Sequence, residues 1–328
     1  MVLALLLIAG WVPQSARAQS DGCSQFSIPI VLRDVRGELI HGYSPNDLEA
    51  KVNGKTLNID STRPEGRPRR IVILLDASGS MRGTEKEVPW GEAIRFAELL
   101  TSRSEGRAQL ALLIFNAKVI EEIGFADDNS AVTKRLGELK KDKRFFDHSV
   151  QGSTALNDAI GRALELLGQS TSADALYIAS DGADTHSRLK RRELQQRLSA
   201  SGVRVFFTLL HIPLEQRSAS PEEENAGPDS SELAQRTGGG IMYISPIWVE
   251  LGFETHPKPI LSEKFRMFFE GMFENEILQV SVANQDLKKR DLRIALSASA
   301  PNHLKGAQLF YPRQLCVCAT TQGVGGTR

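Results

Sequence analysis

The chain has 328 residues, of which 41% are hydrophobic and 24% charged, a composition typical of a folded globular protein that excludes a disordered one. Lysine plus arginine and aspartate plus glutamate both number 40, and aromatic residues make up only 6%, so the composition does not favour a nucleic acid as partner. Three local basic runs are predicted to be solvated surface: Arg63–Arg70, Lys140–Arg144 and Arg188–Arg192.

The first eighteen residues have the pattern of a signal peptide. An apolar run from Val2 to Val12 is too short to span a bilayer comfortably, and Ala16-Arg17-Ala18 forms a small-x-small cleavage pattern. No lysine or arginine precedes the apolar run, so a helix of a cytosolic protein stays open as the alternative. We predict a cleaved signal peptide over residues 1–18, a secreted or periplasmic protein, and no stable insertion into a membrane.

The three cysteines are Cys23, Cys316 and Cys318, an odd number that leaves at least one thiol unpaired in an exported protein. A bridge from Cys23 to one of the other two is one alternative, and the pairing stays open. A lone Cys-x-Cys supplies too few ligands for a zinc site.

A small all-β unit is predicted over residues 24–61. Apolar residues alternate with polar or small ones in its first strand, at Phe26, Ile28, Ile30 and Leu32. Leu48–Val52 and Thr56–Ile59 flank Asn53-Gly54, a dipeptide that favours a tight hairpin turn. The Pro- and Arg-rich stretch Thr62–Arg70 is predicted to be a linker.

Strands and helices alternate over residues 70–246. Buried strands are predicted at Ile71–Leu75, Leu110–Phe115, Ala175–Ala179, Val203–Leu210 and Ile241–Ile244, with Lys118–Ile123 as an edge strand. Helical spacing of apolar residues marks 90–100, 155–167 and 191–200, and Ser231–Arg236 is predicted to be a further helix. The polar stretch Glu215–Ser230 is predicted to be an exposed insertion. This order predicts an α/β fold with a doubly wound, mostly parallel sheet and helices on both faces.

The C-terminal segment over residues 259–298 is predicted to hold a helix around Leu261–Phe273 and two strands, Ile277–Val282 and Leu292–Leu296. Further parallel strands would need crossover helices, so we expect these strands to pair with the N-terminal β unit. The α/β segment would then be inserted into a small β sandwich. The tail over residues 302–328 is predicted to be irregular.

Polar residues follow three predicted strand ends or helix starts. Asp76, Ser78 and Ser80 follow the first buried strand, Thr154 precedes the helix at 155–167, and Asp181 follows the strand at 175–179. In a doubly wound sheet these positions meet at one edge, where ligands bind. Hydroxyl and carboxylate oxygens are hard donors that suit a divalent cation such as Mg²⁺. Turn and helix-capping chemistry is the alternative for each segment taken alone.

In this order, Asp76-x-Ser78-x-Ser80, Thr154 and Asp181 resemble the metal-ion-dependent adhesion site (MIDAS) of the von Willebrand factor A (VWA) domain, called the I-domain in integrins. The resemblance covers roughly residues 70–271, and the order of the segments is similar to bacterial secreted VWA-related proteins. It implies that Ser78 and Ser80 bind the metal directly and that Thr154 does so directly or through water. It implies that Asp76 and Asp181 hold coordinated waters and orient the serines.

The resemblance also implies Mg²⁺ or Mn²⁺ as the metal and a protein partner that presents an Asp or Glu. Asp184, three residues after Asp181, is a candidate for supporting the ligands from behind, with a solvated loop carboxylate as the alternative. Specificity would lie in the loops around the metal.

We therefore predict a metal-dependent protein-binding or adhesion module that acts outside the cytoplasm and has no catalytic activity. One alternative is a Mg²⁺-dependent phosphohydrolase with Asp76 as nucleophile, although that chemistry favours Asp-x-Asp spacing and position 78 is serine. A serine hydrolase is disfavoured because no Gly-x-Ser-x-Gly elbow is present. The remaining alternative is a structural VWA domain with no occupied metal site.

Overall fold

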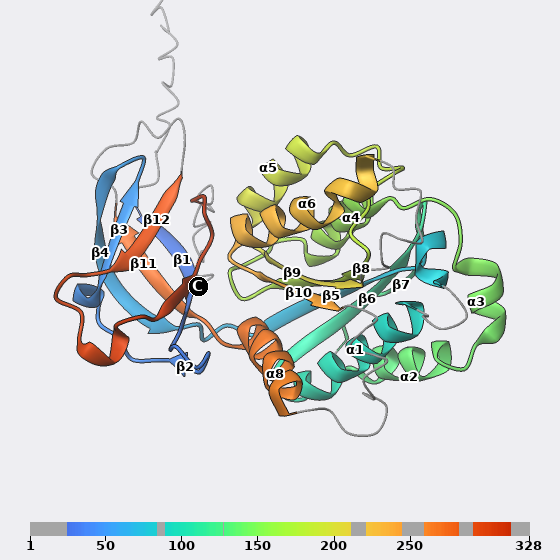
Figure 1. The fold of residues 1–328 in the computed structure, drawn as a ribbon, viewed down its shortest axis with the longest axis horizontal. Coiled ribbons are helices and arrows are strands. Elements are labelled where there is room, and N and C mark those ends of the chain that lie inside the picture. The colour runs from blue at the N-terminus through green and yellow to red at the C-terminus, as the bar shows by residue number, and fades with distance from the viewer. Residues whose placement is uncertain are drawn as a thin grey trace, which may run out of the picture.

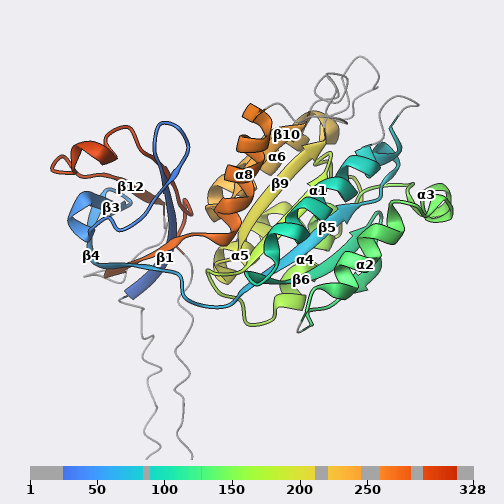
Figure 2. The same ribbon diagram turned by 90° about the horizontal axis from the view of Figure 1, so that it is seen from below.

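The computed structural model describes residues 25–83, 89–126, 128–210, 221–244, 259–281 and 291–315. The predicted signal peptide and the three cysteines lie outside the described residues, so those predictions are untested. The described chain forms two sheets with separate hydrophobic cores, and the two lie side by side in both ribbon views (Figure 1 and Figure 2).

The larger sheet has six strands in the order β10-β9-β8-β5-β6-β7. In its middle, β5 (Arg69–Asp76) is parallel to both β6 (Ala108–Phe115) and β8 (Ala175–Ser180). β9 (Arg204–Leu210) and β10 (Gly240–Ile244) continue the parallel side, whereas β7 (Val119–Ile123) forms an antiparallel edge. The predicted mostly parallel sheet and its edge strand are confirmed.

Helices cover both faces of this sheet. On one face, Ile71, Ile73 and Leu75 pack into a core with α1 (Pro89–Ser104), α2 (Ser130–Leu139) and α8 (Pro259–Phe273). On the other face, Val72 and Leu74 pack with α4 (Leu156–Leu167), α5 (Arg191–Ser201) and α6 (Pro221–Thr237). Successive residues of a strand point to opposite faces, which is why β5 is apolar at every position from 71 to 75. The doubly wound architecture is confirmed (Figure 2).

Two helical regions differ from the sequence-based prediction. The stretch Glu215–Ser230 was expected to be an exposed insertion, but α6 begins at Pro221, and Ala226 and Ser230 are buried. Packing of one face of α6 against β9 outweighs the polar composition of the segment. The short helix α3 (Lys143–Ser149) was not predicted, and Asp142 starts it by accepting a hydrogen bond from Phe145 N at 2.8 Å.

The smaller sheet joins segments from both ends of the chain in the order β12-β3-β4-β11-β1-β13, with β2 (Leu39–Ile40) paired to β1. β11 (Glu276–Ser281) lies between β1 (Gln25–Arg33) and β4 (Lys55–Pro64), antiparallel to both. The hairpin of β3 (Leu48–Val52) and β4 is confirmed, with Asn53 and Gly54 at positive φ.

The remaining strands are β12 (Leu292–Leu296), which pairs with β3, and β13 (Gln308–Phe310), which pairs with β1. The tail from residue 302 is therefore not wholly irregular, because β13 finds its hydrogen-bonding partners in a strand that is distant in sequence.

Charged residues hold the predicted linker in place by hydrogen bonds. Because β4 runs to Pro64 and β5 begins at Arg69, only residues 65–68 lie between the two sheets. The buried Glu65 carboxylate accepts hydrogen bonds from Arg67 Nη2 at 2.6 Å and from Ser172 Oγ at 3.0 Å. Arg69 Nη1 donates to Asn275 Oδ1 at 2.8 Å. The amino ends of the central strands thus face the smaller sheet, and their carboxyl ends lie on the far side (Figure 1).

Candidate metal centre

Asp76 is the last residue of β5 and lies fully buried, with 0% of its surface exposed. Its Oδ1 accepts a hydrogen bond from Ser78 N at 2.8 Å, and its Oδ2 accepts one from Ser180 Oγ at 2.5 Å. Both carboxylate oxygens are therefore held by the neighbouring strand end and the following turn.

Ser78 and Ser80 present their hydroxyls side by side, with the two Oγ atoms 3.1 Å apart. Between them, Gly79 N donates to Gly152 O at 2.9 Å. A Cβ at Gly79 would lie 3.3 Å from that same oxygen, so the absence of a side chain allows the two loops to approach closely. This contact brings the loop that carries Thr154 against the serines.

Thr154 is buried just before α4, with 4% of its surface exposed. Its backbone N–H donates to Thr185 Oγ1 at 3.0 Å, and its carbonyl accepts from Thr185 N and His186 N, both at 2.9 Å. The loop that follows Asp181 is thereby fixed to the loop that precedes α4. All three predicted segments meet at the carboxyl edge of the sheet.

Asp181 is half-buried and follows β8 directly, and its Oδ1 accepts a hydrogen bond from Ala183 N at 3.1 Å. Burial and the nearby charge of Asp181 raise the pKa of Asp76 to about 7, although hydrogen bonds from Ser180 and Ser78 oppose the shift. Two carboxylates in such proximity repel each other when both are ionised, and a bound cation would offset that repulsion.

Asp184 supports the site through α4. Its Oδ1 accepts hydrogen bonds from Leu156 N at 3.0 Å and from Ser187 Oγ at 2.5 Å, and its Oδ2 accepts one from Asn157 Nδ2. Burial raises the pKa of Asp184 above its ordinary value, against these hydrogen bonds. Asp184 is thus a half-buried cap of the helix that Thr154 precedes, and its described contacts do not include Asp76, Ser78 or Ser80.

Sequence reasoning missed two residues of this arrangement. Ser180 stands directly before Asp181, and its hydroxyl bridges the ends of β5 and β8 by donating to Asp76 and accepting from Gly182 N at 2.9 Å. A hydroxyl at the last position of a buried strand was the available signal. Thr185 has no such signal, because its role depends on how two distant loops fold together.

The donor set fits Mg²⁺ or Mn²⁺. Ser78, Ser80 and Thr154 supply neutral hydroxyls, with the carboxylates of Asp76 and Asp181 behind them. Within the described residues, no group of three or more Asp, Glu, His or Cys side chains is placed to hold a metal ion. A metal at this edge would therefore depend on the hydroxyls rather than on a carboxylate cluster.

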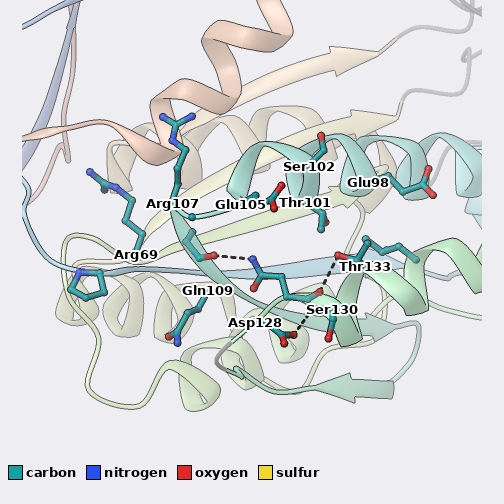
Figure 3. A pocket seen from close by; sticks show the side chains of 15 residues that line it. Arg69, Glu98, Thr101, Ser102, Glu105, Arg107, Gln109, Asp128, Ser130 and Thr133 are labelled. Atoms are coloured by element: carbon teal, nitrogen blue, oxygen red, sulfur yellow. Dashed lines mark hydrogen bonds between the residues drawn. The ribbon is translucent and has the colours of Figure 1, made fainter.

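A cavity of about 990 Å³ lies elsewhere, at the amino edge of the same sheet (Figure 3). It is lined by Arg69, by the residues that begin β6 and by residues of α1 and α2. Arg107 Nη2 donates to Glu270 Oε2 at 2.8 Å, and Asn129 Nδ2 donates to Ala108 O at 2.9 Å. The cavity takes no part in the candidate metal centre.

No helix in the described part of the chain is both long enough and apolar enough to cross a membrane.

Residues 71–183 match the family model of the von Willebrand factor type A domain. No curated protein matches the chain. The match covers Asp76, Ser78, Ser80, Thr154 and Asp181, and it confirms the family resemblance drawn from their order.

Three proteins are among the solved structures that match the chain. An aerotolerance-related membrane protein from Bacteroides fragilis NCTC 9343 is 17% identical, with a TM-score of 0.39 over 54% of this chain and 91% of that chain. The conserved hypothetical protein BatB from Bacteroides thetaiotaomicron is 13% identical, with a TM-score of 0.43 over 62% and 98%. A von Willebrand factor type A protein from Catenulispora acidiphila is 15% identical, with a TM-score of 0.41 over 91% and 75%. Likeness at this level says nothing about function.

Proposed function

We propose that this chain, which contains a von Willebrand factor type A domain, is a metal-dependent protein-binding module that captures an acidic residue of a partner protein. The metal would be Mg²⁺ or Mn²⁺, held by Ser78, Ser80 and Thr154, with Asp76 and Asp181 behind them. The module has no catalytic activity of its own.

The observation that carries the proposal is the environment of Asp76. A fully buried carboxylate beside a second carboxylate, with its pKa raised to about 7, is an unfavourable arrangement unless a cation compensates it. The adjacent pair of hydroxyls, Ser78 Oγ and Ser80 Oγ at 3.1 Å, supplies hard donors directly beside this negative charge.

The division between hydroxyls and carboxylates supports docking rather than catalysis. Neutral donors leave most of the charge of a divalent cation uncompensated, and the bound metal would therefore attract a carboxylate from outside. Ser80 and Asp181 are only half-buried, which leaves a route for such a group from solvent.

The rival phosphohydrolase is less well supported. A nucleophilic aspartate needs an accessible oxygen aimed at the phosphorus, whereas Asp76 is 0% exposed and both its oxygens accept hydrogen bonds. Its position favours a role in orienting Ser78, whose N–H it accepts.

We place the module outside the cytoplasm, in the periplasm or secreted. This part of the proposal rests on the signal-peptide pattern of residues 1–18. N-terminal sequencing of the protein exported by its native cells would test it, with a mature chain beginning at Gln19 as the expected result.

The binding function is tested by using the full chain as bait on surface or periplasmic extract, with Mg²⁺ or with EDTA. We expect a protein that wild type retains in Mg²⁺ and releases in EDTA, and that a Ser78→Ala/Ser80→Ala variant does not retain. The matched control is Ser297→Ala/Ser299→Ala, another serine pair two residues apart whose hydroxyls lie 2.9 Å from each other.

A phosphatase assay with p-nitrophenyl phosphate distinguishes the phosphohydrolase from the binding module. Hydrolysis that is lost in Asp76→Asn would favour the enzyme over the binding module, whereas no hydrolysis by wild type in Mg²⁺ or Mn²⁺ agrees with the proposal.

A further inference from the structure

We propose that the partner of this site is an acidic protein segment with several carboxylates, because the metal centre lies between two basic surfaces. This inference rests on the proposed function, since one carboxylate of the segment would bind the metal. The first surface consists of Arg188, Lys190 and Arg192, and the second of Lys141, Lys143 and Arg144.

The cations of the first basic surface form no ion pair within the described part of the protein. Arg188, Lys190 and Arg192 are exposed, and none of them forms an ion pair with a residue in the described ranges. Arg191, in the same run, instead pairs with Asp229 and with Glu232 of α6. One arginine of the run thus has a structural role, and the other three cations are left facing solvent.

This surface is attached rigidly to the metal centre. The backbone N–H groups of Thr185 and His186 both donate to Thr154 O at 2.9 Å. Immediately after them, Arg188 N and Leu189 N donate to the Asp158 carboxylate at 3.1 and 2.8 Å. Asp158 lies in the first turn of α4, directly beyond Thr154, so the backbone that carries these cations is ordered before any partner binds.

The second basic surface lies on the other side of the serines. Lys141, Lys143 and Arg144 are exposed and form no ion pair with any described residue. The neighbouring Lys140 differs from them, since its Nζ lies 3.2 Å from a Glu98 carboxylate oxygen. Lys143 and Arg144 occupy the first turn of α3, where the helix dipole disfavours positive charge, so helix stability does not explain them.

Arg82 fixes this second surface to the metal loop. It follows Ser80 by two residues, and its Nη1 donates to the carbonyls of Asp147 and Val150, both at 3.2 Å. Gln151 N donates to Ala77 O at 2.9 Å, next to Ser78. In both ribbon views α3 lies at the end of the molecule away from the smaller sheet, beyond the carboxyl ends of the strands (Figure 1 and Figure 2).

The geometry indicates how the partner's carboxylates are spaced. From Val150, beside the metal loop, to Lys143 the helix rises about 10 Å at 1.5 Å per residue. An extended peptide covers that distance in about three residues. We therefore expect acidic residues about three positions from the one that binds the metal.

The surroundings favour a protein segment over a nucleic acid. Base stacking would need exposed aromatic rings, but Phe145 stacks on Trp90 with ring centroids 5.7 Å apart, and Phe146 lies under Arg82. The chain as a whole has a formal net charge of zero, so the cations act locally rather than as an extended basic face.

Isothermal titration with the full chain tests the inference. The probes are Mg²⁺ alone, a synthetic decapeptide with Asp at every third position, and the same peptide with a single Asp and Asn at the other acidic positions. The variants are Arg188→Glu/Lys190→Glu and Lys143→Glu/Arg144→Glu. The control is Lys55→Glu/Lys305→Glu, two exposed lysines of the smaller sheet and its loops.

In Mg²⁺ we expect each basic-surface variant to bind the multi-Asp peptide about tenfold more weakly than wild type, and the control to bind it as wild type does. Affinity for Mg²⁺ alone and for the single-Asp peptide should change by less than about threefold, because salt largely screens exposed charges that lie about 10 Å from the metal. EDTA should abolish binding of both peptides.

Failure of this inference and failure of the proposed function give different results. Mg²⁺ binding that persists while both variants bind the multi-Asp peptide as wild type does would overturn this inference and leave the proposed function intact. Absence of Mg²⁺ binding by wild type would overturn both. Equal peptide binding in EDTA would overturn the joint role of metal and cations. Phosphatidylserine vesicles that bind wild type and not the variants, with peptide binding unchanged, would replace the protein partner with a membrane.

Discussion

Replacing Asp76 with Asn should stabilise the metal-free protein at neutral pH while removing its stabilisation by metal. The Asn side chain has the same shape, and its oxygen can still accept the hydrogen bond that Ser78 N now donates to Asp76 at 2.8 Å. The substitution removes the negative charge that burial and Asp181 destabilise.

The magnitude follows from the pKa of Asp76, which rises from 3.8 to about 7 in the folded protein. Because the folded state holds this proton more tightly than the unfolded chain, the group's contribution to stability is fully present below pH 3.8 and lost as pH rises through about 7. Each pKa unit corresponds to about 1.4 kcal/mol, which bounds the full loss at about 4 kcal/mol. The Asn amide replaces the carboxylate oxygen that accepts from Ser180 Oγ, and the loss of that hydrogen bond costs about 1 kcal/mol. We therefore expect Asp76→Asn to raise the unfolding free energy by about 3 kcal/mol at pH 8.

Urea unfolding in EDTA at pH 5 and pH 8 measures this effect. Wild type should lose about 3 kcal/mol of unfolding free energy between pH 5 and pH 8, and Asp76→Asn should lose almost none. Asp291→Asn, at an exposed carboxylate of the smaller sheet, is the control and should behave as wild type. With Mg²⁺ added, wild type should regain stability and Asp76→Asn should not. An Asp76→Asn protein less stable than wild type at pH 8 in EDTA would refute the reasoning.

Three further substitutions test the supporting structure. Burial raises the pKa of Glu65, but Arg67 outweighs this effect and lowers it from 4.5 to about 2. Wild type should therefore lose stability in urea unfolding as pH falls from 4.5 to about 2, and Glu65→Gln should not show this loss. Asp184→Ala should lower the unfolding free energy by about 1 kcal/mol by uncapping α4, and an unchanged thermal midpoint would contradict this role. Gly182 has φ +85°, and a Cβ added there would lie 2.8 Å from Ser230 Oγ, so Gly182→Ala should destabilise the protein by about 2 kcal/mol or more. Gly168 has φ +57° and open space around it, so Gly168→Ala should cost less when the two variants are compared by urea unfolding.

The α/β architecture was predictable because its signals are local. The run Ile71–Leu75 is apolar at every position, which only a strand covered on both faces requires, and the helix at 155–167 has a clear apolar stripe. The segment of α6 before residue 231 gave no such signal. Ala226 and Ser230 are buried because α6 packs on β9 and β10, and that packing is not visible in the sequence.

The candidate site also has a part that the sequence predicts and a part that depends on tertiary folding. Its five donors follow strand ends or precede a helix, so their meeting at one edge follows from the order of the elements. The contacts that hold them there depend on tertiary folding: Ser180 with Asp76, Gly79 with Gly152, and Thr185 with Thr154. The basic runs at 140–144 and 188–192 were predicted to be solvated surface, and four cations of the first and three of the second are exposed, but their position beside the metal centre required the structure.

Titration of Mg²⁺ and Mn²⁺ into the purified full chain tests the central proposal most directly. Wild type and Ser297→Ala/Ser299→Ala should each bind one equivalent of metal at a site that Ser78→Ala/Ser80→Ala lacks, with all three proteins equally folded by circular dichroism. If wild type binds neither metal, or if the Ser78/Ser80 variant binds as tightly as wild type, these hydroxyls do not form a metal centre.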